Sequence, residues 1–552
     1  MSSPAILYFH PEAYVISGPK LMGRNAAGNS FLKGYASHSK ALTLTALLDH
    51  PTHATEYSSL IEGLGVNRKS QSFSWSEIEA ISGSTLYLPG PDLAEYAWRR
   101  ERVGSTAFSL CGITHTTASA GAMDAICGWL TSPVQPWDAV ICTSQVVKQT
   151  VEVILEKQQD FLRCRFKTAE SISLPQMPII PLGINTQEFD YSDADRSRSR
   201  SELGIAEDAV VILFSGRLSF HAKAHPLAMY QAIEKAAQGG PVVLIECGWF
   251  ANEHIEKAFL DAFNLFCSNI KRVVLDGRDE NSRRLAWSSA DIFCSLSDNF
   301  QETFGLTPLE GMAAGLPVVV SDWNGYRDTV RDGIDGFRIP TYQPPSGLGE
   351  DLAFRHACNV DNYDMYCGHT SQLVAVDIEL VTQALAALIH DRSLREQMGN
   401  AARTRARQDF DWATIIPRYE ELWSELNAMR QFHKNKQGDC GVQDRPGRLD
   451  PFILFQSYPT RTLQASDQLQ LAPSYPNAQL AYERLIELRQ LQMIQFAEFV
   501  QLTNNDCQAI FQFLEGGAKT VEQIVCLGAP TARVHIHRSL LWLMKIGLIR
   551  AL

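Results

Sequence analysis

The sequence contains no hydrophobic run that approaches the roughly 18 residues needed to span a bilayer. Its first residues, MSSPAILYFHPEAY, lack the charged segment and apolar core of a secretory signal. The 12 cysteines are scattered without a C-x-x-C pair, so neither a zinc knuckle nor a dithiol redox motif is indicated. We therefore expect a cytoplasmic protein with mostly free thiols, and peripheral contact with a membrane stays open.

Basic residues are also fewer than acidic ones. The chain has 49 Lys and Arg against 61 Asp and Glu, a formal net charge of -12. A general nucleic-acid binder needs a basic face that releases counterions from phosphates, so this balance argues against nucleic acid as a partner. An anionic ligand would have to be met by a few local cations.

Short apolar runs are abundant, and they alternate with amphipathic stretches of helix length. The first third holds AILYFH, STLYLPG, STAFSLCGITH and WDAVICTS. The pattern restarts after 178–190 with AVVILFSGRLS, GPVVLIECG, IKRVVLDG, ADIFCSLSD and LPVVVSD. Such runs with helices between them predict buried parallel strands and an α/β fold.

At 552 residues the chain is too long for one core, and it divides into several predicted parts. Two Rossmann-like domains are expected at 1–190 and 191–410, and a closing helix at 411–432 is expected to pack back toward the first domain. Polar residues with proline and glycine predict a linker at 433–479. Residues 480–552 predict a small, mainly helical domain that resembles a winged helix.

The most informative stretch is SLSDNFQETFGLTPLEGMAAGLPVVVSDWNGYRDTVRDGIDGF. Pro308 suits a first helical turn and Gly315 the position past its end, so a short helix is expected to begin near Pro308 at a strand's carboxyl edge. The first backbone amides of a helix have no partners within it, and this end of the helix dipole is positive. Both features favour the binding of a diphosphate at such a helix start. The residues expected to supply those amides are Thr303, Phe304 and Gly305.

This stretch resembles the donor-site signature of the retaining glycosyltransferases of family 4, written E-x-F-G-x(4)-E and followed by A-G-x-P-V-V. The resemblance covers about residues 1–430, and it implies the GT-B fold, in which two Rossmann-like domains enclose a cleft. It also implies that Glu302 binds hydroxyls of the donor sugar and Glu310 those of the ribose. Gly325 resembles the family's second phosphate-side glycine.

A second motif, FSGRLSFHAKAHP, follows a predicted strand that ends at Gly216. Two cations at the carboxyl end of a strand can neutralise a diphosphate leaving group. By the resemblance these cations are Arg217 and Lys223. Their spacing is one residue longer than the family's common form, with His221 and Ala222 between them.

The first half contributes further candidates. The stretch GPKLMGRNAAGNSFLKGY predicts a loop in which Gly23 and Gly28 let the backbone approach a phosphate or acceptor. By the resemblance His115, at a strand end, contacts the transferred sugar, and Arg278 lies in a segment that holds the nucleotide base. Ser144 is expected to cap a helix.

The resemblance implies a hexosyltransferase that moves a sugar from a nucleotide-diphosphate sugar with retention of configuration. The acceptor stays open and is a glycan, a lipid or a protein. An Asp-x-Asp string at 193–195 has charged surroundings that predict a solvated loop, and neither a metal nor a cofactor is expected.

Two alternatives stay open. One is another GT-B enzyme, a sugar-nucleotide epimerase or a sugar-phosphate-accepting synthase. The other is binding of DNA or protein through the C-terminal domain, whose basic candidates are Arg533, His535, His537 and Arg538. Because that domain also carries many acidic residues, packing or docking to a protein partner is favoured over DNA.

Overall fold

Six parallel strands form the first sheet, in the spatial order β3-β2-β1-β4-β5-β6. The computed structural model describes residues 5–15, 23–167, 172–437 and 444–552. The strands are β1 Ile6–Phe9, β2 Thr43–Leu48, β3 Lys69–Phe73, β4 Thr85–Tyr87, β5 Ser109–Ile113 and β6 Ala139–Ile141. The helices that connect them are α1 Pro11–Tyr14, α2 Gly23–His38, α3 Ala54–Gly63, α4 Ala94–Arg100, α5 Ala120–Gly128 and α6 Gln145–Phe166.

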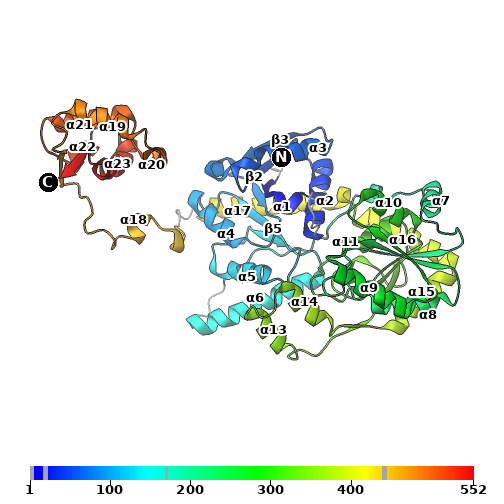
Figure 1. Cartoon of the computed structure of the whole chain (residues 1–552). Helices are drawn as coiled ribbons and strands as arrows, with labels where there is room; N and C mark the ends of the chain where they lie inside the picture. Colours follow the sequence, from blue (N-terminus) through cyan, green and yellow to red (C-terminus); the bar gives the residue numbers. More distant parts are fainter. Residues whose placement is uncertain (1–4, 16–22, 168–171, 438–443) are drawn as a thin grey trace. The chain divides into compact units, whose positions relative to one another are not determined.

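The second sheet repeats this arrangement, with six parallel strands in the order β12-β11-β10-β7-β8-β9 (Figure 1). Its strands are β7 Val210–Ser215, β8 Val242–Gly248, β9 Lys271–Asp276, β10 Ile292–Ser295, β11 Val318–Ser321 and β12 Gly336–Ile339. Its helices are α8 Leu227–Ala237, α9 Glu253–Phe266, α10 Glu280–Ser289, α11 Leu306–Ala313, α12 Tyr326–Thr329, α15 Ile378–His390 and α16 Arg392–Asp409. In both sheets the strand order reverses beside the first strand, and ligands of open α/β sheets bind at such a switch point. The prediction of two Rossmann-like domains is confirmed.

One charged segment between the domains differs from the prediction. The solvated loop expected around 193–195 is the start of helix α7 (Asp193–Glu202). Ser192 Oγ accepts from the amide of Asp195 at 3.2 Å, and Asp195 accepts in return from the amide of Ser192 at 3.1 Å. This capping box explains the helix, because it satisfies amides that the first turn leaves without partners.

The two domains are joined by two chain crossings that lie side by side. Ile184 donates its amide to the carbonyl of Phe410 at 2.9 Å and accepts from the amide of Trp412 at 3.1 Å. Thr186 Oγ1 adds a hydrogen bond of 2.5 Å to the carboxylate of Asp411. The two crossings are therefore held together at one place.

Helix α17 (Trp412–Gln437) runs from the second crossing onto the first domain and packs against α2. Trp412 Nε1 donates to Ser30 Oγ at 2.8 Å, and a Cβ added to Gly34 would lie 2.3 Å from the indole. Tyr419 and Trp423 are buried among rings of the first domain. The helix therefore completes the hydrophobic core of that domain.

Residues 446–552 form a second unit with its own core. Its elements are α18 Pro451–Leu454, β15 Gln468–Leu471, α19 Ala478–Leu488, α20 Gln492–Gln495, α21 Asn504–Glu515, β16 Lys519–Thr520, α22 Val521–Val525, α23 Arg533–Lys545 and β17 Ile549–Ala551. The predicted linker at 433–479 is wrong at both ends, because α17 continues to Gln437 and β15 pairs antiparallel with β16 and β17. The small sheet was not predicted, and residues 480–552 are otherwise mainly helical, as expected.

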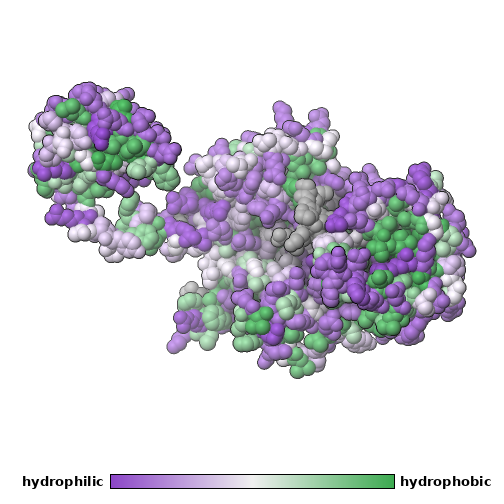
Figure 2. Space-filling view, viewed as in Figure 1, coloured by the Kyte–Doolittle hydropathy of each residue, from purple (hydrophilic) through white to green (hydrophobic). Residues whose placement is uncertain are grey.

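The surface of this unit is relevant to the predicted alternative that it binds DNA or a protein partner. His535 Nε2 lies 2.9 Å from the carbonyl oxygen of Gln501, so that nitrogen is already paired within the unit. Large apolar side chains are exposed on α20 and just after it, among them Met493, Phe496 and Phe499, and Figure 2 shows apolar surface on the visible face of the unit. The resemblance to a winged helix stays a prediction. In the described ranges, no helix is long and apolar enough to cross a membrane.

Candidate functional site

The loop after β10 turns sharply into helix α11. The helix begins at Leu306, two residues before Pro308, and Gly315 lies just past its end with φ of +80°. Gly305 occupies the N-cap position with φ of +85°, and a Cβ added there would lie 2.0 Å from Cε1 of Tyr326. Glycine is required because both the backbone conformation and the buried ring exclude a side chain. The predicted short helix is present, and its first amides open toward the preceding loop.

Lys223 and Glu302 meet at this helix start. Lys223 Nζ and Glu302 Oε2 form an ion pair, with the two side chains 24% and 11% exposed. Burial opposes the charged form of Lys223, but the carboxylate of Glu302 outweighs it and raises the pKa of the amine above its ordinary value. Arg217 lies alongside, donating to Gln301 Oε1 at 3.2 Å and to the carbonyl of Ala222 at 2.9 Å.

The loop that carries Lys223 is tied to the loop after β10. Ser297 Oγ donates to the carbonyl of Lys223 at 3.2 Å, and Asn299 Nδ2 donates to the carbonyl of His221 at 2.8 Å. The extra residue in the Arg-to-Lys spacing therefore does not displace Lys223 from Glu302. Asn299 was not predicted as a site residue, although it lies within the motif-bearing stretch 295–337.

Gly325 lies against the backbone that leads into α11. A Cβ added to it would lie 2.4 Å from Cα of Phe304 and 2.6 Å from the carbonyl oxygen of Thr303. Asn324, with φ of +43°, donates through Nδ2 to the carbonyl of Glu302. The Asn-Gly pair thus holds the residues predicted to supply phosphate-binding amides.

Three glycines at strand ends also lie against one another. Gly216 follows β7 with φ of +144°, and a Cβ on Gly248, the last residue of β8, would lie 1.9 Å from the carbonyl oxygen of Gly216. A Cβ on Gly277, after β9, would lie 2.9 Å from Cα of Gly248. Gly248 and Gly277 were not predicted, although both end predicted apolar strands.

The first domain reaches the same helix start through two strand ends. Thr303 Oγ1 donates to the carbonyl of His115 at 3.0 Å, and Ser144 Oγ donates to the carbonyl of Thr303 at 3.0 Å. Ser144 also accepts from the amide of Val147 at 3.3 Å, which confirms that it caps α6. His115 is thus placed beside the loop that carries Glu302, as expected for strand ends that share a crevice.

The chain is similar to known proteins over part of its length. Residues 195–350 match the family described as "Glycosyl transferases group 1". Over this segment the chain is similar to the group 1 glycosyltransferases. HepE of Anabaena, solved in complex with UDP, superposes with a TM-score of 0.50 at 16% identity, over 76% of this chain and 100% of that one, which shows the GT-B fold.

Curated relatives match over a shorter length. D-inositol 3-phosphate glycosyltransferase of Xylanimonas cellulosilytica is 28% identical over 38% of this chain and 50% of its own length. The protein of that name from Geodermatophilus obscurus is 32% identical over 30% of this chain and 37% of its own. The chain therefore spans half or less of these relatives.

Glu310 lies on α11, after the loop that carries Glu302. Burial raises the pKa of its carboxyl group to about 7, although the cation of Arg283 opposes the shift. Arg283 itself donates to the carbonyls of Gly277 and Arg278 at 2.9 and 3.2 Å. The Arg278 side chain is half exposed and paired with Asp276 at 2.7 Å, so its assignment to the nucleotide base stays a prediction.

The glycine loop predicted in the first domain is mostly helix. Gly23 and Gly28 belong to α2, and residues 16–22 lie outside the described residues. A Cβ added to Gly28 would lie 2.0 Å from the carbonyl oxygen of Ala13, so this glycine lets α2 approach α1 closely. The expected loop conformation is wrong for both glycines, and their contact with a phosphate or acceptor stays a prediction.

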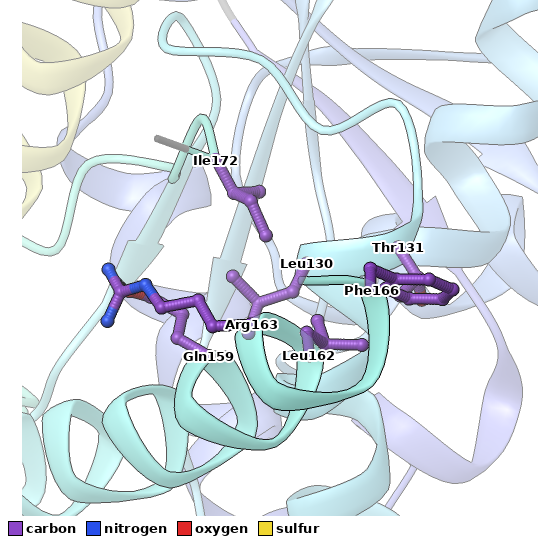
Figure 3. Close-up of a pocket in the computed structure, with 7 residues that line it drawn as sticks. All are labelled: Leu130, Thr131, Gln159, Leu162, Arg163, Phe166 and Ile172. Carbon is purple, nitrogen blue, oxygen red and sulfur yellow. Dashed lines mark hydrogen bonds between the residues drawn. The ribbon is translucent and has the colours of Figure 1, made fainter. Parts of the chain in front are cut away.

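A separate pocket lies beside the C-terminal half of α6 (Figure 3). It is mainly apolar, and Arg163 is its charged lining group. Its lining residues are Leu130, Thr131, Gln159, Leu162, Arg163, Phe166 and Ile172. None of the predicted site residues lines it, so it is distinct from the site at α11.

Proposed function

We propose that this chain transfers a sugar from a nucleotide-diphosphate sugar to a hydroxyl acceptor with retention of configuration. The observation that carries the proposal is the contact between Lys223 and Glu302 at the start of α11, with Arg217 beside it. Two cations and a set of helix-start amides suit a diphosphate, and the carboxylate suits sugar hydroxyls.

In the proposed reaction the bond between the sugar carbon and the diphosphate oxygen breaks while a bond to the acceptor oxygen forms on the same face. The acceptor proton moves to the departing diphosphate oxygen, so no protein nucleophile is needed. Arg217 and Lys223 stabilise the charge that develops on the leaving group. Glu302 and His115 hold the sugar, which makes positioning the other contribution of the protein.

Glu310 and the glycines complete the proposed donor site. The carboxylate of Glu310 accepts from the ribose hydroxyls, and Gly216 and Gly325 leave room for the phosphates. HepE was solved with UDP, so UDP-sugars belong in a donor panel together with GDP- and ADP-sugars. The acceptor is to be identified by experiment.

The test is a thermal-shift panel followed by an activity assay. A nucleotide sugar that binds the folded state raises the unfolding temperature by mass action. We expect Glu302→Gln to keep this shift and to lower sugar transfer by about 100-fold, since it removes a charge next to the reacting centre. Glu425→Gln, on the exposed face of α17, is the matched control and should leave both unchanged.

Full transfer by Glu302→Gln, or the absence of a shift with every donor, would remove the proposal. Products of a labelled donor separate the alternatives. An epimerised donor without a new glycosidic bond would indicate an epimerase, and a phosphorylated disaccharide a sugar-phosphate-accepting synthase.

A further inference from the structure

Two short helices of the second domain follow the residues that match the family. The match stops at residue 350, and the chain then forms α13 (Glu350–Ala357) and α14 (Tyr363–Ser371). The strands on either side, β13 (Thr341–Tyr342) and β14 (Ala375–Val376), pair antiparallel and bring the ends of this helical segment together. Figure 1 shows both helices on the same side of the second domain as α9.

Helix α14 packs against the loop that carries Lys223. A Cβ added to Gly368 would lie 3.1 Å from Cβ of His221, which is closer than ordinary van der Waals contact. His221 is one of the residues between Arg217 and Lys223, where the spacing is longer than usual in the family. The longer loop and helix α14 are therefore in direct contact.

The same helix reaches the first domain. Tyr363 Oη lies 3.4 Å from Oγ1 of Thr116, the residue after His115. Thr116 Oγ1 also accepts from the amide of Ala118 at 3.3 Å. A typical hydrogen bond between hydroxyls is about 2.7–2.8 Å long, so a small closing movement would complete this one. Burial raises the pKa of Tyr363, which keeps the phenol protonated and able to donate.

We propose that Tyr363 is a positioning residue, and that its hydrogen bond to Thr116 forms when the domains close on the donor and holds the His115 loop against the transferred sugar. The inference rests on the proposed function. Since α14 also contacts His221, it links the diphosphate side of the site to the sugar side. Without this bond the donor still binds through Arg217 and Lys223, but the sugar is less well enclosed.

A poorly closed site admits water as a competing acceptor. Water oxygen then bonds to the sugar carbon, the bond to the diphosphate oxygen breaks, and a water proton moves to the diphosphate, giving free sugar and nucleotide. The ratio of hydrolysis to transfer therefore reports closure. A merely structural role of Tyr363 would leave that ratio unchanged.

The experiment compares Tyr363→Phe with Tyr366→Phe. Tyr366 lies on the same helix, and its ring stacks on His356 of α13 at 4.3 Å. We expect Tyr363→Phe to keep the nucleotide thermal shift, lower transfer about threefold to tenfold, as for one hydrogen bond, and raise the hydrolysis ratio. Tyr366→Phe should match the wild type. The double variant Thr116→Val with Tyr363→Phe should lose less than the sum of the two single losses, because the two substitutions remove the same hydrogen bond between them.

Unchanged transfer and hydrolysis in Tyr363→Phe, or losses that add in the double variant, would overturn the inference. Hydrogen exchange supplies a readout without turnover: nucleotide sugar should protect the amide of Ala118 in the wild type and not in Tyr363→Phe. Equal protection in both would remove this inference alone. A wild type that binds no nucleotide sugar would instead remove the proposed function.

Discussion

Glu310 is a carboxyl group whose charge should depend on pH near neutrality. Burial raises its pKa to about 7, so the group is mostly protonated below that pH and ionised above it. A ribose hydroxyl donates more strongly to a carboxylate than to a neutral acid. We therefore expect the affinity for nucleotide to rise with pH through about 7, as measured by calorimetric titration.

Glu310→Gln is the control for this dependence, because a neutral amide should leave the affinity flat across the same range. The folded-state pKa lies above the usual 4.5, so the contribution of Glu310 to stability without ligand is present below 4.5 and is lost as the pH rises through about 7. A nucleotide affinity that falls as the pH rises would contradict the assignment of Glu310 to the ribose.

At the scale of an element, the start of α11 depends on Gly305. Gly305→Ala forces a side chain into φ of +85° and against Tyr326, so we expect the free energy of unfolding to fall by about 2–4 kcal/mol. Gly347 has a similar φ of +94° with nothing within 4 Å, and Gly347→Ala should cost about 1 kcal/mol. Chemical denaturation of both variants measures the difference. Equal losses in the free energy of unfolding would show that the ring of Tyr326 moves aside to make room for the added methyl group.

The elements differ in how well the sequence predicted them. Strands buried on both faces, such as β7 and β10, were recognised because every residue is apolar or small. β3, with the sequence KSQSF, was missed because it is a polar edge strand. Helix α7 was taken for a loop because its residues are polar on all sides, although Ser192 and Asp195 had the spacing of a capping box.

The candidate site was predicted only where its residues belong to a motif that is continuous in the sequence. Glu302 and Lys223 stand in motifs that are continuous in the sequence, so their types and spacing could be recognised. The contact between Tyr363 and Thr116 joins residues 247 positions apart, and it depends on how the domains pack. No local pattern encodes such a contact.

At the scale of the whole molecule, α17 determines where the chain can be shortened. A chain ending after residue 445 keeps α17 with its three buried rings, Trp412, Tyr419 and Trp423, and the rest of the first unit. We expect this fragment to fold and to keep the thermal shift with nucleotide sugar. Residues 446–552 have a separate core and should melt in a transition of their own by calorimetry.

A chain ending at Asp409 is the contrasting variant, because it lacks α17 altogether. Loss of a buried large aromatic side chain costs about 3–5 kcal/mol, and three such losses are as large as the total stability of a typical domain, about 5–15 kcal/mol. We expect this shorter chain not to unfold cooperatively. If it melts as the 1–445 fragment does, the closing helix is dispensable, and if the 1–445 fragment fails to bind nucleotide sugar, the donor site depends on the C-terminal unit.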